Sequence, residues 1–194
     1  VRDRSGRCKR AAMTDTTLTK SAIEPVSFAL YDTDFEAFSR ALGDSFRRYG
    51  FAVISDYDME QARIDAALDA AKRFFALPEA VKTRYAVGKG GQRGYIPFGI
   101  ETAKGATHHD LKEFWHMGRD LPPGHRYEPQ MPPNVWPAET SDFQEKVSWL
   151  YGALDSMGVK VLQAIAHYLG LPRHQFDDAV AEGNSCLLYT SRRG

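Results

Sequence analysis

Three residues have the types and spacing of an iron-binding site. His108 and Asp110 form an H-x-D pair, and His167 follows 57 positions after Asp110. Two histidines and one carboxylate are the ligands that many non-haem iron(II) sites use. His167, however, lies in an apolar stretch with helical spacing, whereas such a site needs its ligands on rigid neighbouring elements around one cavity. A structural histidine on a helix flank is therefore the favoured interpretation, and a metal site at these three residues is the alternative.

A glycine-rich segment at residues 88–94 contains Lys89 and Arg93, which could together bind a phosphate group. Its spacing matches neither G-x-x-x-x-G-K-[ST] nor a G-x-G-x-x-G that follows a strand, the two common phosphate-binding motifs. The segment also follows a predicted helix rather than a strand. We therefore interpret residues 88–94 as a flexible glycine connector.

Arg93 and Tyr95 are the candidate substrate-binding residues. An arginine beside glycines can donate two parallel hydrogen bonds to a carboxylate, and a tyrosine hydroxyl can add another. The alternative is that Tyr95 belongs to the core and that Arg93 pairs with a surface acid. Further along the chain, Lys112 and Glu113 alternate with apolar residues and are predicted to lie on a solvated face. His116 could line a pocket.

These candidates lie among elements that the apolar spacing predicts. A helix is expected to begin at Thr33, because Thr33 and Glu36 form a capping box, and to end at Gly50. A buried strand is expected over residues 51–54, and a second amphipathic helix over residues 59–75. The sequence thus predicts a helix, a strand and another helix before the glycine-rich connector.

A long helix is predicted over residues 142–169, where apolar residues again recur at helical spacing. Ser141 and Gln144 supply its capping box. At about 1.5 Å per residue this helix is on the order of 40 Å long, enough to brace a whole domain. Residues 120–139 hold six of the ten prolines, so the segment before the helix is expected to cross the surface without regular hydrogen bonding.

The net charge of zero hides an uneven distribution. Residues 1–12 carry a charge of +4 and residues 186–194 carry +2, which leaves −6 on the chain between them. Both cysteines, Cys8 and Cys186, also lie in these end segments. An acidic body without cysteine argues against a nucleic-acid partner, disulfides and thiolate metal sites. No apolar run reaches the roughly 18 residues of a membrane span, so we expect a cytoplasmic protein without a membrane partner.

Five segments resemble, in their order along the chain, the N-terminal region of the isopenicillin N synthase-like family of 2-oxoglutarate- and iron(II)-dependent oxygenases. They read RRYGFAVISDYDM, AAKRFFALPEAVKTRYA, QRGYIPFGIETAKG, DLKEFWHMGRDLP and a proline-rich stretch ending NVWP. The resemblance covers residues 25–185. It implies a mixed α/β fold dominated by helices, which forms the N-terminal lobe of a double-stranded β-helix (jelly-roll) oxygenase with an incomplete barrel.

The resemblance also implies the chemistry of a full-length parent protein. Such a parent would bind Fe(II) and 2-oxoglutarate and oxidise a small molecule, with an H-x-D pair and a distal histidine as metal ligands beyond this segment. Residues 186–194 depart from the family where its barrel strand would continue. We therefore expect a chain that ends before the metal site, is inactive alone, binds neither cofactor and lacks its C-terminal barrel. Arg93 and Tyr95 would face the substrate.

Three regions follow from these observations. Residues 1–12 are interpreted as a non-native leader, residues 13–185 as the oxygenase N-terminal domain and residues 186–194 as a non-native tail. A different class of function stays open, namely a non-catalytic scaffold or interaction module. Such a module would present the apolar stripe of the long helix, from Phe143 to Leu169, as its binding face.

Overall fold

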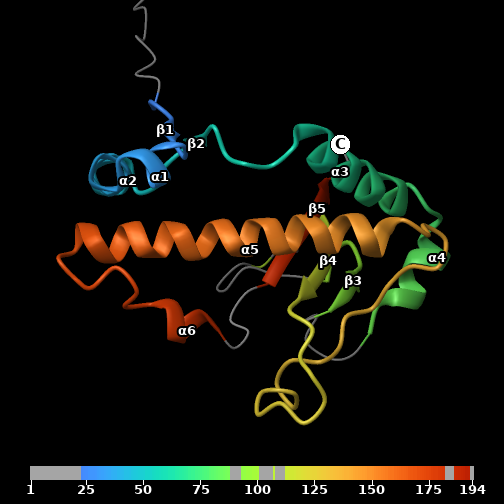
Figure 1. The fold of residues 1–194 in the computed structure, drawn as a ribbon. Helices are drawn as coiled ribbons and strands as arrows, with labels where there is room; N and C mark the ends of the chain where they lie inside the picture. The colour runs from blue at the N-terminus through green and yellow to red at the C-terminus, as the bar shows by residue number, and fades with distance from the viewer. Residues whose placement is uncertain (1–22, 88–92, 101–106, 108–111, 182–185, 193–194) are drawn as a thin grey trace, which may run out of the picture.

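One long helix organises the molecule. The structure, a computed structural model, describes residues 23–87, 93–100, 107, 112–181 and 186–192. Helix α5 (Phe143–Tyr168) crosses the whole molecule in Figure 1. It confirms the long bracing helix that the sequence predicts, to within a residue at each end.

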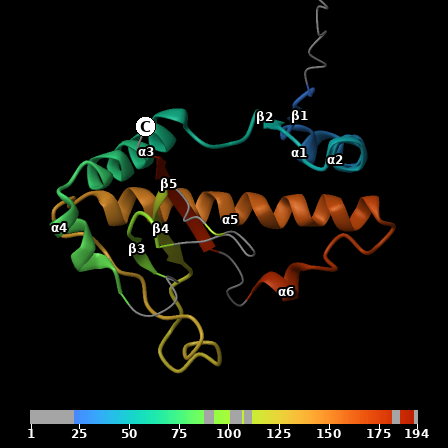
Figure 2. The same ribbon diagram turned by 180° about the vertical axis from the view of Figure 1, so that it is seen from behind.

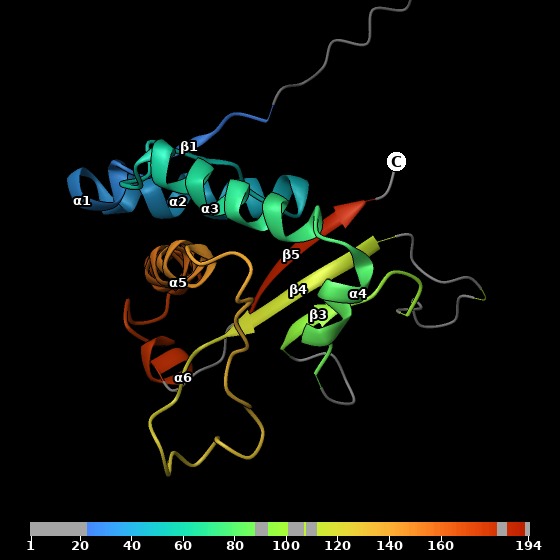
Figure 3. The same ribbon diagram turned by 90° about the vertical axis from the view of Figure 1, so that its right-hand side faces the viewer.

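The other elements lie on two sides of α5. Helices α2 (Phe35–Tyr49) and α3 (Gln61–Phe75) follow one side, while β3 (Gly94–Ile96), β4 (Lys112–Gly118) and α6 (Asp177–Ala181) lie on the other, in both Figure 1 and the reverse view of Figure 2. Strand β5 (Cys186–Arg192), which completes the sheet of β3 and β4, crosses α5 in these views and reaches α3. With α5 seen end-on, the sheet extends sideways from it (Figure 3). In chain order these elements are β1 (Val26–Ser27), α1 (Leu30–Thr33), α2 (Phe35–Tyr49), β2 (Ile54–Ser55), α3 (Gln61–Phe75), α4 (Glu79–Lys82), the 3₁₀ helix η1 (Thr83–Tyr85), β3 (Gly94–Ile96), β4 (Lys112–Gly118), α6 (Asp177–Ala181) and β5 (Cys186–Arg192).

Helix α5 is shared by two hydrophobic cores. Its N-terminal half contributes Phe143, Val147 and Leu150 to a core with α3, β3 and β4. Its C-terminal half contributes Ala164 to a second core with β1, α1 and α2, and partly buried apolar residues of α5 pack around it. The apolar stripe is therefore covered along most of its length, and Leu169 at its end is exposed.

The predicted helix starts are each displaced. Asp34, not Thr33, caps α2, because its carboxylate accepts a hydrogen bond from the Ala37 backbone N–H at 3.0 Å. The capping box predicted at Ser141 is also wrong, because α5 begins after Asp142, whose side chain makes no cap bond. The end of α2 is as predicted, since Gly50 adopts the left-handed conformation with φ +80°.

The predicted strand over residues 51–54 is also largely wrong. Strand β2 contains only Ile54 and Ser55 and pairs in parallel with β1. Phe51 and Val53 are exposed, at 51% and 42%. Among the described residues, β1 has only Val26 and Ser27 for pairing, so it pairs with the end of the apolar run alone.

The second sheet has the order β3-β4-β5, with both pairings antiparallel. Strand β5 lies in residues 186–194, interpreted above as a non-native tail, and its backbone pairs with β4 from Gly118↔Cys186 to Lys112↔Arg192. The boundary at residue 186 stays a prediction. In the described part of the chain, no helix is long and apolar enough to cross a membrane.

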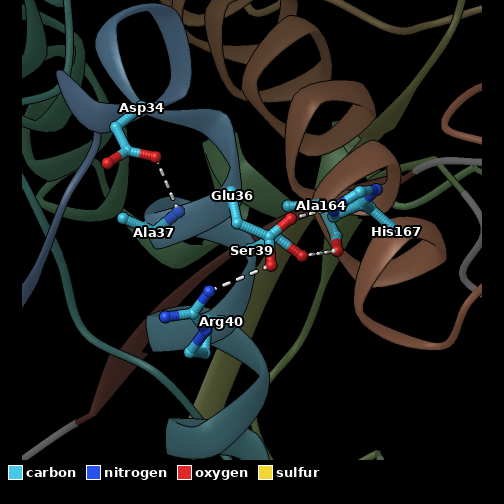
Figure 4. Close-up of polar contacts among 7 residues, drawn as sticks. All are labelled: Asp34, Glu36, Ala37, Ser39, Arg40, Ala164 and His167. Carbon is cyan, nitrogen blue, oxygen red and sulfur yellow. Dashed lines mark hydrogen bonds and ion pairs between the residues drawn. The ribbon is translucent and has the colours of Figure 1, made fainter.

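Direct polar contacts join α2 to the C-terminal half of α5 (Figure 4). The Ser39 hydroxyl donates to the Ala164 carbonyl at 2.8 Å. Nε2 of His167 lies 2.5 Å from a carboxylate oxygen of Glu36. Beside them, Gly43 lets the Tyr168 ring lie against the α2 backbone, because a Cβ at Gly43 would overlap that ring.

The close approach at Gly43 predicts opposite effects for two glycine substitutions. Gly43→Ala is expected to lower the free energy of unfolding by about 1–3 kcal/mol, because the new methyl group would push Tyr168 away from α2. The matched control is Gly152→Ala in α5, where nothing lies within 4 Å of the added Cβ. It is expected to raise the free energy of unfolding by about 0.5–1 kcal/mol. Urea denaturation checks both, and equal effects would contradict the α2–α5 packing.

A second prediction concerns Asp142, at the start of α5. Hydrogen bonds from Lys146 and Arg73 lower the pKa of Asp142 from 3.8 to about 2. Because the folded-state pKa is the lower one, the carboxylate stabilises the fold above pH 3.8, and this contribution disappears as the pH falls from 3.8 toward 2.

Asp142→Asn is therefore expected to be destabilising at pH 7, by an amount that shrinks below about pH 4. Urea denaturation at a series of pH values from 7 to 3 measures the difference from the unmodified chain. Asp178→Asn, at an exposed acid of α6, is the control. A difference at Asp142 that stays constant over this range would contradict the role of its charge.

Candidate functional site

Strands β3 and β4 bring together most of the candidate residues. Tyr95 pairs with Trp115 in the register of the two strands, and both side chains belong to the core beside α3 and α5. Tyr95 is 2% exposed. Its hydroxyl donates to Oε2 of Glu113 at 2.5 Å, diagonally across the strand pair. This geometry corresponds to the core alternative for Tyr95.

A buried ion pair lies at the same carboxylate. Lys82, the last residue of α4, places its Nζ 2.6 Å from Oε2 of Glu113, and the two side chains are 2% and 3% exposed. The same ammonium group donates to the carbonyl of Phe75 at 3.1 Å and lies 5.4 Å from the Tyr95 ring centroid. We call Lys82, Glu113 and Tyr95 the buried network. It joins α4, β3, β4 and the end of α3.

The prediction that Glu113 lies on a solvated face is wrong. On a strand, residues two apart share a face, so Glu113 lies with Trp115 and Met117, which are both core residues. Lys112, Phe114 and His116 occupy the other face of β4. That shared face was the available signal for burial of Glu113. The cation that makes its burial possible comes from Lys82, 31 residues earlier, which sequence reasoning did not connect to it.

Arg93 lies immediately before β3 and is 7% exposed. Its guanidinium group packs against Gly118 at the end of β4, where a Cβ would overlap it. Asn134, in the proline-rich segment, fixes Gly118 from two sides. Its Oδ1 accepts from the Gly118 N–H at 2.9 Å, and its Nδ2 donates to the Gly118 carbonyl at 2.6 Å. The almost buried guanidinium group of Arg93 therefore has a defined position against Gly118, at the end of β4.

The opposite face of β4 carries the remaining candidate, His116, beside Phe114. The rings of Phe114 and His116 lie 5.9 Å apart, and Lys112 Nζ lies 4.6 Å from the Phe114 ring centroid. His116 is partly buried and Phe114 is 1% exposed. His116 thus lies on the sheet face that points away from α3 and α5.

The iron-site alternative finds no support in the described residues. His108 and Asp110 lie outside the described residues. His167 lies on α5, as predicted, and contacts Glu36 and the ring of Phe35. Across the described ranges, no three His, Cys, Asp or Glu side chains lie together in a way that could hold a metal ion.

A polar clamp fixes the proline-rich segment beside this site. The Tyr85 hydroxyl donates to Oε2 of Glu139 at 2.6 Å and accepts from the Ala138 N–H at 2.9 Å. The Glu139 carboxylate raises the pKa of Tyr85, and the Tyr85 hydroxyl lowers the pKa of Glu139. Arg84 also pairs with Glu139. The segment that contains Asn134 is thereby attached to η1.

Comparison with known proteins shows the family of the chain. Residues 23–139 match the sequence profile of the family described as non-haem dioxygenase in morphine synthesis N-terminal. The chain belongs to this family. A solved structure of a protein assigned to the 2OG-Fe(II) oxygenase family, from Caulobacter crescentus, is 65% identical with a TM-score of 0.80. The match covers 87% of this chain and 55% of that one.

Two curated relatives agree with this placement. The 2-oxoglutarate-dependent dioxygenase caaD of Aspergillus niger is 32% identical over 72% of this chain and 43% of its own length. The enzyme eupC of Phoma sp, with the same description, is 30% identical over 68% of this chain and 44% of its own length. The chain thus spans about half the length of the relatives it matches. The resemblance to an oxygenase N-terminal region is confirmed.

The buried network predicts a large penalty for removing one charge. Glu113→Gln is expected to lower the free energy of unfolding by roughly 3–5 kcal/mol, because it leaves the Lys82 ammonium buried without a counter-charge. The control replaces the whole network by apolar groups, as Lys82→Met, Glu113→Leu and Tyr95→Phe together. That variant is expected to unfold within about 1 kcal/mol of the unmodified chain. Thermal and urea denaturation measure both. A mild effect of Glu113→Gln would contradict full burial of the pair.

Proposed function

We propose that this chain forms the N-terminal lobe of a 2-oxoglutarate- and Fe(II)-dependent oxygenase that acts on a small molecule. The observation that carries the proposal is the 65% identity to the Caulobacter crescentus protein, together with the TM-score of 0.80. Solved relatives have been crystallised with alpha-KG, and one with 2OG, Fe and JA, but at 22–23% identity they support the fold alone. Fold by itself does not fix chemistry, so the proposal requires a direct test.

The described residues do not fit an iron site, so the proposal places the metal elsewhere. A jelly-roll barrel would supply the metal ligands and the binding groups for 2-oxoglutarate, and the present lobe would support that barrel. Iron with 2-oxoglutarate would supply the oxidising power when bound. The part of this chain is to build one wall of the substrate pocket and to exclude water from it.

In this proposal Arg93 binds the substrate. Its guanidinium group can donate two parallel hydrogen bonds to a carboxylate, and Gly118 with Asn134 holds it in a defined position. A substrate with a carboxylate or a similar planar acceptor fits that donor pair. Tyr95, the other candidate, uses its hydroxyl on Glu113, so its contribution to the pocket wall is to hold β3 in place.

The scaffold alternative has no observation in its favour. It requires an exposed apolar stripe on α5, but Phe143, Val147 and Leu150 are buried against α3 and the sheet. The C-terminal half of the stripe packs against α1 and α2. Leu169 at the helix end is exposed, and the stripe residues from Leu154 to Ile165 are partly buried.

A chimaeric enzyme tests the proposed function. Residues 23–181 of this chain replace the matching segment of the Caulobacter crescentus protein, and succinate formation from 2-oxoglutarate is measured with and without added Fe(II). We expect iron-dependent succinate formation by the chimaera and none by the 194-residue chain alone. The unaltered relative, assayed in parallel, is the control. Succinate formation by the 194-residue chain would show that the metal site is misplaced here, and a folded but inactive chimaera would contradict the oxygenase lobe.

A further inference from the structure

The buried network presents a physical puzzle. Two opposite charges that are 2% and 3% exposed have lost nearly all contact with water. Desolvation of such a pair costs about as much as the attraction returns, so well-packed apolar residues would stabilise the fold equally well. The network therefore calls for a role other than stability.

That role is suggested by the shortness of β3. The strand has three residues, and Gly94 has no side chain, so only Tyr95 and Ile96 can specify its alignment with β4. A slip by one residue is excluded, because it would turn Tyr95 out of the core. A slip by two residues keeps every side chain on its face. The apolar pattern of β3 cannot exclude that second alignment.

A directional contact can exclude it. In the observed register Tyr95 lies opposite Trp115, and its hydroxyl reaches Glu113 at 2.5 Å. A slip of two residues moves that hydroxyl by about 7 Å, which breaks the bond. Lys82 then fixes the acceptor, because it holds the same oxygen of Glu113 at 2.6 Å and is itself bound to the Phe75 carbonyl.

The contacts that β3 makes with η1, on its other side, do not fix the register of β3 on β4. Gly94 passes so close to the Tyr85 carbonyl that a Cβ there would overlap it, and Gly94 also pairs with Ala86. These contacts align β3 with η1. The ring of Tyr85 in η1 also lies 6.1 Å from that of Trp115 on β4, but this apolar contact has no donor and acceptor to fix a register. Since Lys82 lies directly before η1 and binds Glu113 on β4, the buried network supplies the directional contact between the η1–β3 unit and β4.

We propose that the Lys82–Glu113–Tyr95 network sets the register of β3 on β4 and thereby positions Arg93 over Gly118. The three residues are positioning residues and not substrate ligands. The proposal rests on the proposed function in one respect only, namely that Arg93 faces the substrate. A slip of two residues would carry Arg93 about 7 Å away from Gly118 and so remove it from the pocket wall.

Disulfide trapping in the full 194-residue chain tests the register directly. In a background with Cys8→Ser and Cys186→Ser, the pair Ile96→Cys with Phe114→Cys reports the observed register, in which these positions are opposite. Ile96→Cys with His116→Cys, or with Lys112→Cys, reports a slip of two residues in either direction. Cross-linking needs Cα atoms within about 7 Å, so each pair reports only its own register.

With the network intact, we expect only the pair at positions 96 and 114 to cross-link. Tyr95→Phe removes one hydroxyl and is expected to raise slipped cross-linking about tenfold, the ratio that loss of one hydrogen bond to a charged group allows. The apolar triple variant Lys82→Met, Glu113→Leu, Tyr95→Phe is expected to raise it further while keeping its melting temperature.

Should the triple variant fail to fold, Tyr95→Phe alone decides the question. Cross-linking only at positions 96 and 114 in every folded variant would overturn the proposal. Because this measurement does not depend on activity, a failed register test leaves the oxygenase proposal standing. A folded but inactive chimaera with a network-dependent register would instead contradict the proposed function, and with it the substrate role of Arg93, while the register proposal would stand.

Discussion

The packing of two hydrophobic cores on one helix is the constraint on which the structure depends. Helix α5 buries Phe143, Val147 and Leu150 against α3 and the sheet, and packs its C-terminal half against α1 and α2. Each large apolar side chain contributes about 1.5–3 kcal/mol when fully buried. The helix therefore fixes how the two cores lie relative to each other. The sheet with Arg93 takes its position from the first core, and the contacts of Glu36 and Ser39 hold the second.

The sequence carries enough information to predict the helices but not their first residues. Apolar spacing over many residues identifies α2, α3 and α5, because a helical stripe is a repeated signal. A cap depends on one side chain, and Thr33 and Asp34 are both competent to accept a backbone N–H. Asp34 caps α2, while the Thr33 hydroxyl donates to the Ala29 carbonyl at 2.9 Å. Asp is the somewhat better cap, but the capping box of Thr33 with Glu36 favours the neighbouring residue, so the local signals point to different positions.

The candidate site was predictable in part for a related reason. Arg93 and Tyr95 stand out because a charge and a hydroxyl beside glycines are unusual, and the structure places both on β3 or directly before it. Glu113 was missed because a carboxylate is rarely buried unless it is paired. Its partner Lys82 lies in a four-residue helix with no apolar repeat to mark its inner face. Burial of a charge is decided by a distant residue, and one sequence does not show that pairing.

Surface and buried ion pairs differ in how far they determine the structure. Pairs such as Arg40 with Glu36, whose side chains are 64% and 61% exposed, contribute little to stability because water screens them. The Lys82–Glu113 pair also contributes little net stability, but for the opposite reason, since its attraction is cancelled by desolvation. Only the buried Lys82–Glu113 pair depends strongly on geometry, because a different alignment of the surrounding elements would leave a buried charge without water or a partner. This dependence on geometry has its greatest structural effect at β3, because apolar burial alone cannot fix the register of so short a strand.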